Sequence, residues 1–215
     1  MLQSADELAG SAAASSDEFT SLLGRADQAR HRGEYREAVK RAKKAIALDP
    51  AEAEGYFYLA NAYADSADFT NAVPQFLKAM ELADTGTPYH RQFGDEKWAK
   101  AASSAYNCLW QCDAPKPAWY TDTQNVKRMA DRAVAALPED FGALQMRVNV
   151  CSRTPKDSIP LDDQRQLLRD VRGLLAALKE GSPAHEHNLK LAAEIEAHIR
   201  KRIAADLAAL KLADD

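Results

Sequence analysis

The chain carries one helical pattern twice, and this repetition constrains its fold more than any other feature of the sequence. The recurring residues lie 34 positions apart: Ala38, Val39, Lys44, Ala45 and Leu48 in the first copy, and Ala72, Val73, Lys78, Ala79 and Leu82 in the second. Within each copy the apolar members return every three or four residues, as on the buried face of an α-helix. The repetition therefore predicts a helical unit that the chain uses more than once.

Further residues of the second copy stand at the spacings of a known signature. They are Tyr56, Leu59, Ala60, Tyr63, Ala72 and Phe76. With the 34-residue period, they resemble the tetratricopeptide-repeat family. The resemblance implies an all-α fold, a right-handed superhelix of antiparallel helix pairs. Because the last apolar face of such a solenoid must be covered, we also expect a long C-terminal capping helix.

Helix signals divide the chain into three parts. We expect a flexible acidic leader at residues 1–15, a repeat domain at 16–182 and the capping helix and tail at 183–215. A capping box of Ser15 and Glu18 predicts that the first helix begins near Ser16. The repeats are placed at 19–52, 53–86, 95–140 and, in degenerate form, 141–182.

The third repeat is longer than the others. Pro115 and Pro117 forbid a continuous helix there, so the excess is placed in an insertion at residues 112–121. An ordinary lengthened loop and a loop with a function of its own both fit this insertion.

In the resembled family, the first helix of each pair lines a concave groove that binds peptides or helices of other proteins. The positions beside the core face therefore form a predicted partner-binding groove. They are Arg30, His31, Phe57, Asn61, Asp65, Tyr106, Asn107, Gln145, Asn149 and Arg153. Amide groups can hydrogen-bond the backbone of an extended ligand, the aromatic rings can receive its side chains, and the guanidinium groups can pair with carboxylates. The alternative is a polar face that binds only solvent.

One branch of the family holds the C-terminal carboxylate of cytosolic chaperones with a clamp of Lys, Asn and Arg residues. The corresponding positions here are Leu23, Asp27, Tyr58, Ala99 and Ser103. An acidic side chain at residue 27 would repel a terminal carboxylate. We therefore expect a repeat protein of the non-carboxylate-clamp type.

Motifs for catalysis or metal binding are missing from the sequence. Cys108 and Cys112 are one helical turn apart, a spacing that two metal ligands can use, but no further ligands have supporting spacing. His185 and His187 lack the i, i+4 spacing of a helical zinc site. We predict no catalytic residue, no metal and no cofactor, and hence a protein that is not an enzyme.

Composition narrows the partners and the compartment. The net charge is −4, which disfavours nucleic acid, and no apolar run is long enough to span a membrane. Only three cysteines occur, and the leader is acidic rather than basic, which together favour a reduced, cytoplasmic protein.

These observations predict a scaffold or adaptor that binds a peptide or helical segment of a protein partner in its groove. The alternative is a permanent subunit of a larger complex that docks through the capping helix or the 112–121 insertion. The capping helix has an apolar stripe that also permits self-association. Its members are Leu191, Ile195, Ile199, Ile203, Leu207 and Leu210.

Overall fold

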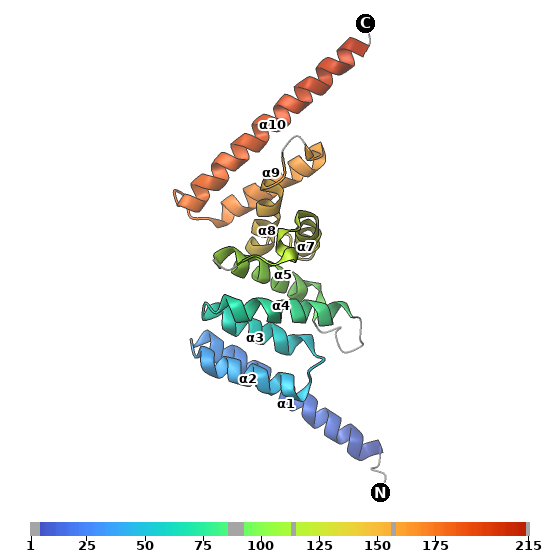
Figure 1. The fold of residues 1–215 in the computed structure, drawn as a ribbon, viewed down its shortest axis with the longest axis vertical. Helices are drawn as coiled ribbons and strands as arrows, with labels where there is room; N and C mark the ends of the chain where they lie inside the picture. Colours follow the sequence, from blue (N-terminus) through green and yellow to red (C-terminus); the bar gives the residue numbers. More distant parts are fainter. Residues whose placement is uncertain (1–4, 86–92, 113–114, 156–157, 214–215) are drawn as a thin grey trace. The chain divides into compact units, whose positions relative to one another are not determined.

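The computed structural model describes residues 5–85, 93–112, 115–155 and 158–213, with side chains from residue 16 to residue 205. Within these residues the chain forms ten α-helices and no β-strand (Figure 1). The chain divides into two compact units, Met1–Lys116 and Pro117–Asp215. The all-α prediction is confirmed.

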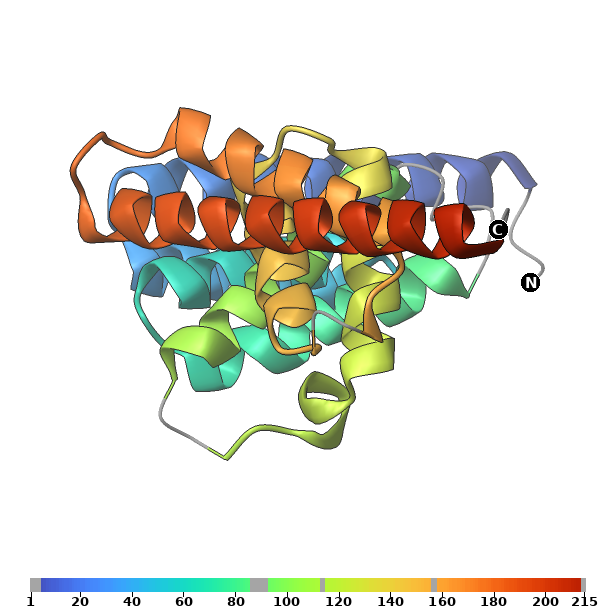
Figure 2. The same cartoon turned by 90° about the horizontal axis from the view of Figure 1, so that it is seen from above.

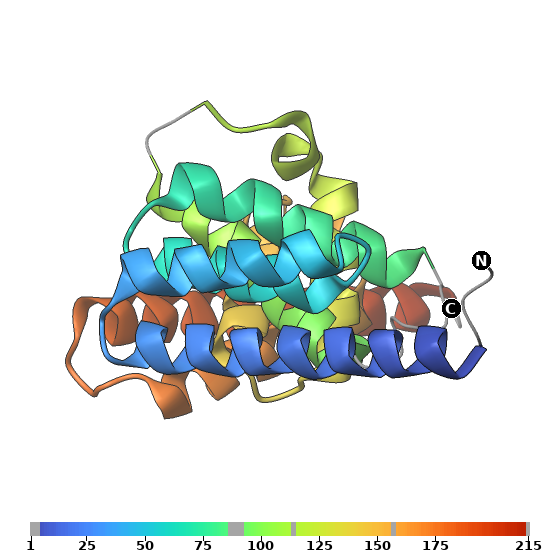
Figure 3. The same ribbon diagram turned by 90° about the horizontal axis from the view of Figure 1, so that it is seen from below.

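The first unit contains five helices in which each packs on the next. They are α1 (Ala5–His31), α2 (Tyr35–Leu48), α3 (Ala53–Asp65), α4 (Phe69–Asp84) and α5 (Gly94–Gln111). Helix α1 also contacts α3, so the first helices of successive pairs are neighbours. Figure 3 shows α1 and α2 side by side and antiparallel.

The turns inside the first two helix pairs have the same backbone structure. Gly33 has φ +76° and Ala67, 34 residues later, has φ +61°. In the first turn Glu34 N donates to Ala29 O at 2.9 Å, and in the second Asp68 N donates to Tyr63 O at 2.9 Å. This bond, from the second residue after the C-cap back over five residues, defines a Schellman motif. The 34-residue period thus governs backbone geometry as well as side-chain pattern.

Small residues let the first three helices of the unit approach closely. The core consists of successive layers to which α1 and α2 contribute, and α3 joins two of them. The layers are Phe19, Leu23 and Ala45; Ala26, Ala42 and Leu59; and Ala29, Ala38 and Ala62. Helices α2 and α3 lie close together at Gly55 of α3, where a Cβ atom would lie 2.8 Å from Ile46 Cγ1. Close helix packing here depends on alanine and glycine.

The second unit contains the remaining helices. They are α6 (Ala118–Thr121), α7 (Thr123–Ala136), α8 (Phe141–Ser152), α9 (Leu161–Ala177) and α10 (Pro183–Ala213). Asp122 caps α7 and Asp140 caps α8 by accepting backbone N–H bonds at the first turn. Helix α10 packs along α9 (Figure 2), with Ile195 and Ile199 buried. The prediction of a long C-terminal capping helix is confirmed.

The structure differs from the predicted boundaries in three places. Helix α1 begins at Ala5, not near Ser16, because an alanine-rich segment continues a helix readily and outweighs the capping signal at Ser15. The insertion contains a short helix, α6, and the third repeat at 95–140 crosses the boundary between the two units. Parts of the predicted leader, second repeat and its linker, insertion and tail lie outside the described residues, namely residues 1–4, 86–92, 113–114 and 214–215. The side chains of Leu207 and Leu210 also lie outside them. The division into leader, repeats and tail otherwise stays a prediction.

Candidate functional site

Predicted groove residues of α1 and α3 meet at one surface of the first unit. Arg30 Nη1 of α1 donates to Asp65 Oδ2 of α3 at 2.6 Å. Its Nε and Nη2 donate to Asp27 Oδ1 at 3.1 and 2.8 Å. His31 completes the cluster, with its Nε2 lying 3.5 Å from Asp27 Oδ2. The structure therefore brings Arg30, His31 and Asp65 together at one surface. We call this surface, with Asn61 and Asn107, the first-helix face.

The charged side chains of this cluster form ion pairs with one another. Partial burial opposes the charge on Arg30, yet its hydrogen bonds to Asp27 and Asp65 raise the pKa of the guanidinium. The sequence predicted that Arg30 can pair with a carboxylate of a ligand, whereas in the structure it forms ion pairs with two carboxylates of its own chain. A ligand acid would have to displace one of them.

Two amides of the first-helix face keep their hydrogen-bonding capacity. Asn61 of α3 and Asn107 of α5 are half-buried. Among the described residues, neither side chain has a hydrogen-bond partner. Each offers both a donor and an acceptor, which is what the backbone of an extended peptide requires.

The two aromatic residues predicted to receive ligand side chains lie within the protein. Tyr106 is completely buried, so its predicted position on a partly exposed face is wrong. Helix α5 is buried on several sides, as its neighbours Ala99 and Ser103 show, and a stripe pattern identifies one buried side only. Phe57 is half-buried in edge-to-face contact with Phe76 and Phe93, with ring centroids 6.1 and 5.6 Å apart.

In the second unit the predicted residues form two separate pairs. Gln145 Nε2 donates to Asn149 Oδ1 at 2.7 Å along α8. The guanidinium of Arg153 lies 5.3 Å from the ring centroid of Tyr120 and donates to its hydroxyl at 3.3 Å. Arg153 therefore holds the short helix α6 against the end of α8.

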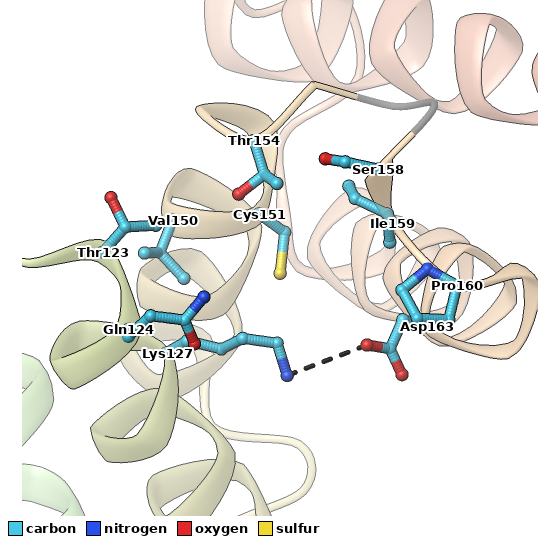
Figure 4. A pocket seen from close by; sticks show the side chains of 10 residues that line it. All are labelled: Thr123, Gln124, Lys127, Val150, Cys151, Thr154, Ser158, Ile159, Pro160 and Asp163. Atoms are coloured by element: carbon cyan, nitrogen blue, oxygen red, sulfur yellow. Dashed lines mark ion pairs between the residues drawn. The ribbon is translucent and has the colours of Figure 1, made fainter.

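A pocket of about 270 Å³ opens among α7, α8 and the segment that leads into α9 (Figure 4). Its lining residues are Thr123, Gln124, Lys127, Val150, Cys151, Thr154, Ser158, Ile159, Pro160 and Asp163. Lys127 Nζ lies 3.8 Å from Asp163 Oδ2 and 2.9 Å from Asp131 Oδ2. Burial raises the pKa of the Cys151 thiol to about 11, so this thiol is neutral near pH 7.

A buried ion pair lies beside this pocket and joins α8 to α9. Arg147 Nε donates to Asp170 Oδ2 at 2.6 Å, and Nη2 donates to the other carboxylate oxygen. Gln166 Nε2 adds a hydrogen bond to Asp170 Oδ1 at 2.9 Å. The Asp170 side chain is only 3% exposed, so its charge depends on these partners.

The predicted groove omitted Asp27, the residue that binds Arg30 and approaches His31. Two signals identify it: opposite charges at i and i+3 on one helix, and a repeat period that brings residue 31 next to residue 65. The pocket of Figure 4 has no comparable signal, because its residues come from elements joined only by tertiary packing.

In the part of the chain with described side chains, no three His, Cys, Asp or Glu residues gather closely enough to hold a metal ion. None of the described helices combines the length and hydropathy that a bilayer-spanning segment needs.

The fold defines a class of protein, an all-helical repeat protein built from antiparallel helix pairs. Comparisons with known proteins narrow the class. A family model described as TPR repeat matches residues 26–66. The crystal structure of MamA protein is similar at 17% identity over 91% of this chain and 96% of that chain, with a TM-score of 0.51. A thermophilic TPR protein of Thermus thermophilus is similar at 16% identity over 88% and 99%, with a TM-score of 0.50. No curated protein sequence matches the chain.

Residues 26–66 therefore match the TPR repeat family, and the solved repeat proteins share the all-helical repeat fold of this chain. The matched segment runs from the second half of α1 to the end of α3 and so contains the Gly33 turn and the Arg30–Asp65 contact. Proteins of this family generally mediate protein–protein interactions.

Proposed function

We propose that the protein is a non-enzymatic scaffold or adaptor that binds a peptide or helical segment of a partner protein on the first-helix face. The observation that carries this proposal is the Arg30–Asp65 contact of 2.6 Å. This contact joins equivalent ends of α1 and α3, and so makes one continuous surface from two repeats. A surface shared between repeats is the form of binding site that helical-repeat proteins offer.

The chemistry of this surface favours an extended backbone over an acidic tail. Asn61 and Asn107 can each hydrogen-bond a peptide group without breaking a contact of the protein. Arg30 is already engaged by two carboxylates, which supports the expectation that the protein does not act as a carboxylate clamp. Asn149, Gln145 and Arg153 of the second unit remain proposed contacts of the same kind.

Affinity capture from the source cell lysate tests the proposal. The wild type is compared with the double variant Asn61→Ala/Asn107→Ala, and captured proteins are quantified by mass spectrometry. We expect specific partners to be lost from the variant, since two backbone-directed hydrogen bonds lost at a buried contact cost about tenfold or more in affinity.

A matched control removes an amide that lies outside the first helices of the pairs, Gln75→Ala on α4. This control should retain the partners at equal thermal stability. Retention of all partners by the Asn61→Ala/Asn107→Ala variant would show that recognition lies elsewhere.

A second candidate function is a permanent subunit of a larger complex. Two exposed apolar side chains favour it: Trp110, 57% exposed at the end of α5 beside the insertion, and Leu189, 48% exposed on the capping helix. Leu189 would also serve self-association through α10. A subunit purified alone should bind a hydrophobic dye and self-associate, and Trp110→Ser/Leu189→Ser should reduce both effects, whereas an adaptor should show neither.

We also infer a cytoplasmic location. The support is that Cys108, Cys112 and Cys151 are free thiols in the structure, which suits a reducing compartment. Fluorescence imaging of the tagged chain in the source cell tests this inference.

A further inference from the structure

The outward face of α2 carries four positive charges at helical spacing. These residues, which we call the basic stripe, are Arg36, Lys40, Lys43 and Lys44. All four are exposed, while Ala38, Ala42 and Ala45 on the opposite side of the helix are completely buried. Residues three and four apart are neighbours on a helix surface, so the four charges form one patch.

No carboxylate of the described residues forms an ion pair with the basic stripe. Lys43 Nζ contacts the Tyr63 ring at 5.8 Å from its centroid, which is a contact with an uncharged group. The one acidic residue of α2, Glu37, is hydrogen-bonded to Arg41 at 2.8 Å. That bond lowers the pKa of Glu37, and the charges of Lys40 and Lys44 lower it further, so positive charge dominates this side of the helix.

The basic stripe stands out against an acidic unit. Helix α2 has five Arg and Lys residues and one Glu, a net charge of +4. Residues 1–116 have 13 Arg and Lys and 17 Asp and Glu, a net charge of −4, so the unit outside α2 carries −8. Like charges at i, i+4 destabilise a helix slightly, and an acidic ligand would remove that repulsion.

We propose that the basic stripe binds a short acidic segment of a partner protein. The stripe is about 12 Å long, since it covers about eight residue steps of about 1.5 Å each. About four extended residues, or two turns of a helix with Glu or Asp at i, i+4, cover that length.

Charge complementarity favours a short segment over a longer polyanion. The Debye length at physiological salt is about 8 Å, so a nucleic acid or membrane reaching past the stripe would feel the surrounding acidic surface. The surface is distinct from the first-helix face, which α1, α3 and α5 form, so the two proposals stand or fall separately.

Fluorescence anisotropy with the full chain and a fluorescein-labelled tetraglutamate peptide, which matches the length of the stripe, tests the proposal at about 20 mM and about 150 mM salt. The variant is Lys40→Gln/Lys43→Gln/Lys44→Gln. Its control, Lys100→Gln/Lys179→Gln/Lys190→Gln, removes the same charge from exposed lysines elsewhere. Circular dichroism confirms that both variants stay folded.

We expect wild type to bind the peptide more tightly at low salt. The stripe variant should lose about tenfold in affinity, and the control should lose less than about twofold. Equal binding by wild type and the stripe variant would overturn the proposal, as would an equal loss in the control. Tighter binding of a single-stranded oligonucleotide, or of vesicles containing phosphatidylserine, would overturn it in favour of those ligands.

Discussion

Replacing Ala67 with glycine is expected to stabilise the protein. Ala67 has φ +61° in the turn between α3 and α4, a left-handed conformation in which Cβ lies too close to the neighbouring carbonyl. The equivalent turn between α1 and α2 has Gly33 at φ +76°, where that conformation causes no strain. Both turns close with the same pair of backbone hydrogen bonds, so the side chain at the left-handed residue is what separates them.

The magnitude follows from two opposing effects. A non-glycine residue in the left-handed region costs about 1–2 kcal/mol. Glycine gains freedom in the unfolded chain, which costs about 0.4–1 kcal/mol on folding. The difference predicts that Ala67→Gly raises the free energy of unfolding by about 0.5–1 kcal/mol. Gly33→Ala should lower it by a similar amount.

Urea unfolding followed by circular dichroism measures both variants. Ala47→Gly, at an exposed position in the last turn of α2, is the control, because the same change within a helix should destabilise by up to about 1 kcal/mol. Stabilisation by Ala67→Gly beside destabilisation by Ala47→Gly would assign the effect to backbone conformation. A destabilising Ala67→Gly change, or a neutral Gly33→Ala change, would refute that assignment.

Three further results are expected. Gly24→Ala should stabilise α1 by about 0.5–1 kcal/mol, because its added Cβ meets no atom within 4 Å. Gly55→Ala should not stabilise α3, since its Cβ would lie 2.8 Å from Ile46 of α2. Thermal unfolding of the two variants compares these effects. Asp170→Ala should destabilise by about 3 kcal/mol, because it leaves the buried guanidinium of Arg147 with only the more distant carboxylate of Asp131, at 3.9 Å. Asp162→Ala in an exposed pair should cost less than about 0.5 kcal/mol in urea unfolding, and similar costs for the two variants would contradict the burial argument. Alkylation of Cys151 by iodoacetamide, followed by mass spectrometry, should be slow near neutral pH and rise about tenfold per pH unit up to a pKa of about 11, and a plateau near pH 8 would contradict it.

The first two helix pairs were predictable because period and packing agree there. Ala38 and Ala72, which the repeat places in equivalent positions, are both completely buried, and so are Ala45 and Ala79. The Gly33 turn was predictable for the same reason, since glycine after an apolar stripe indicates a left-handed helix end. Local signals are sufficient where each helix buries one side.

The environment of Tyr106 was not predictable from its own helix. Periodicity identifies the most apolar side of α5, but in a helix buried on several sides the residues outside that apolar stripe are buried as well. Asn107, the next residue, remains half-buried with an available amide, so burial changes within one residue step along α5. The predicted start of α1 was wrong for a different reason, because an alanine-rich segment needs no capping residue to remain helical.

The ion cluster at Arg30 has a consequence for how quickly a partner finds the first-helix face. Asp27 and Asp65 lie within 2.8 Å of the guanidinium, so the cluster cancels most of its own field. A surface of this kind gives little long-range attraction, and its encounter rate should change little with ionic strength. The cations of the basic stripe, which have no carboxylate partner among the described residues, would by contrast accelerate the approach of the proposed acidic segment. The two proposed surfaces of this unit would thus differ in how a ligand arrives: by diffusion alone at the first-helix face, and with electrostatic attraction at the basic stripe.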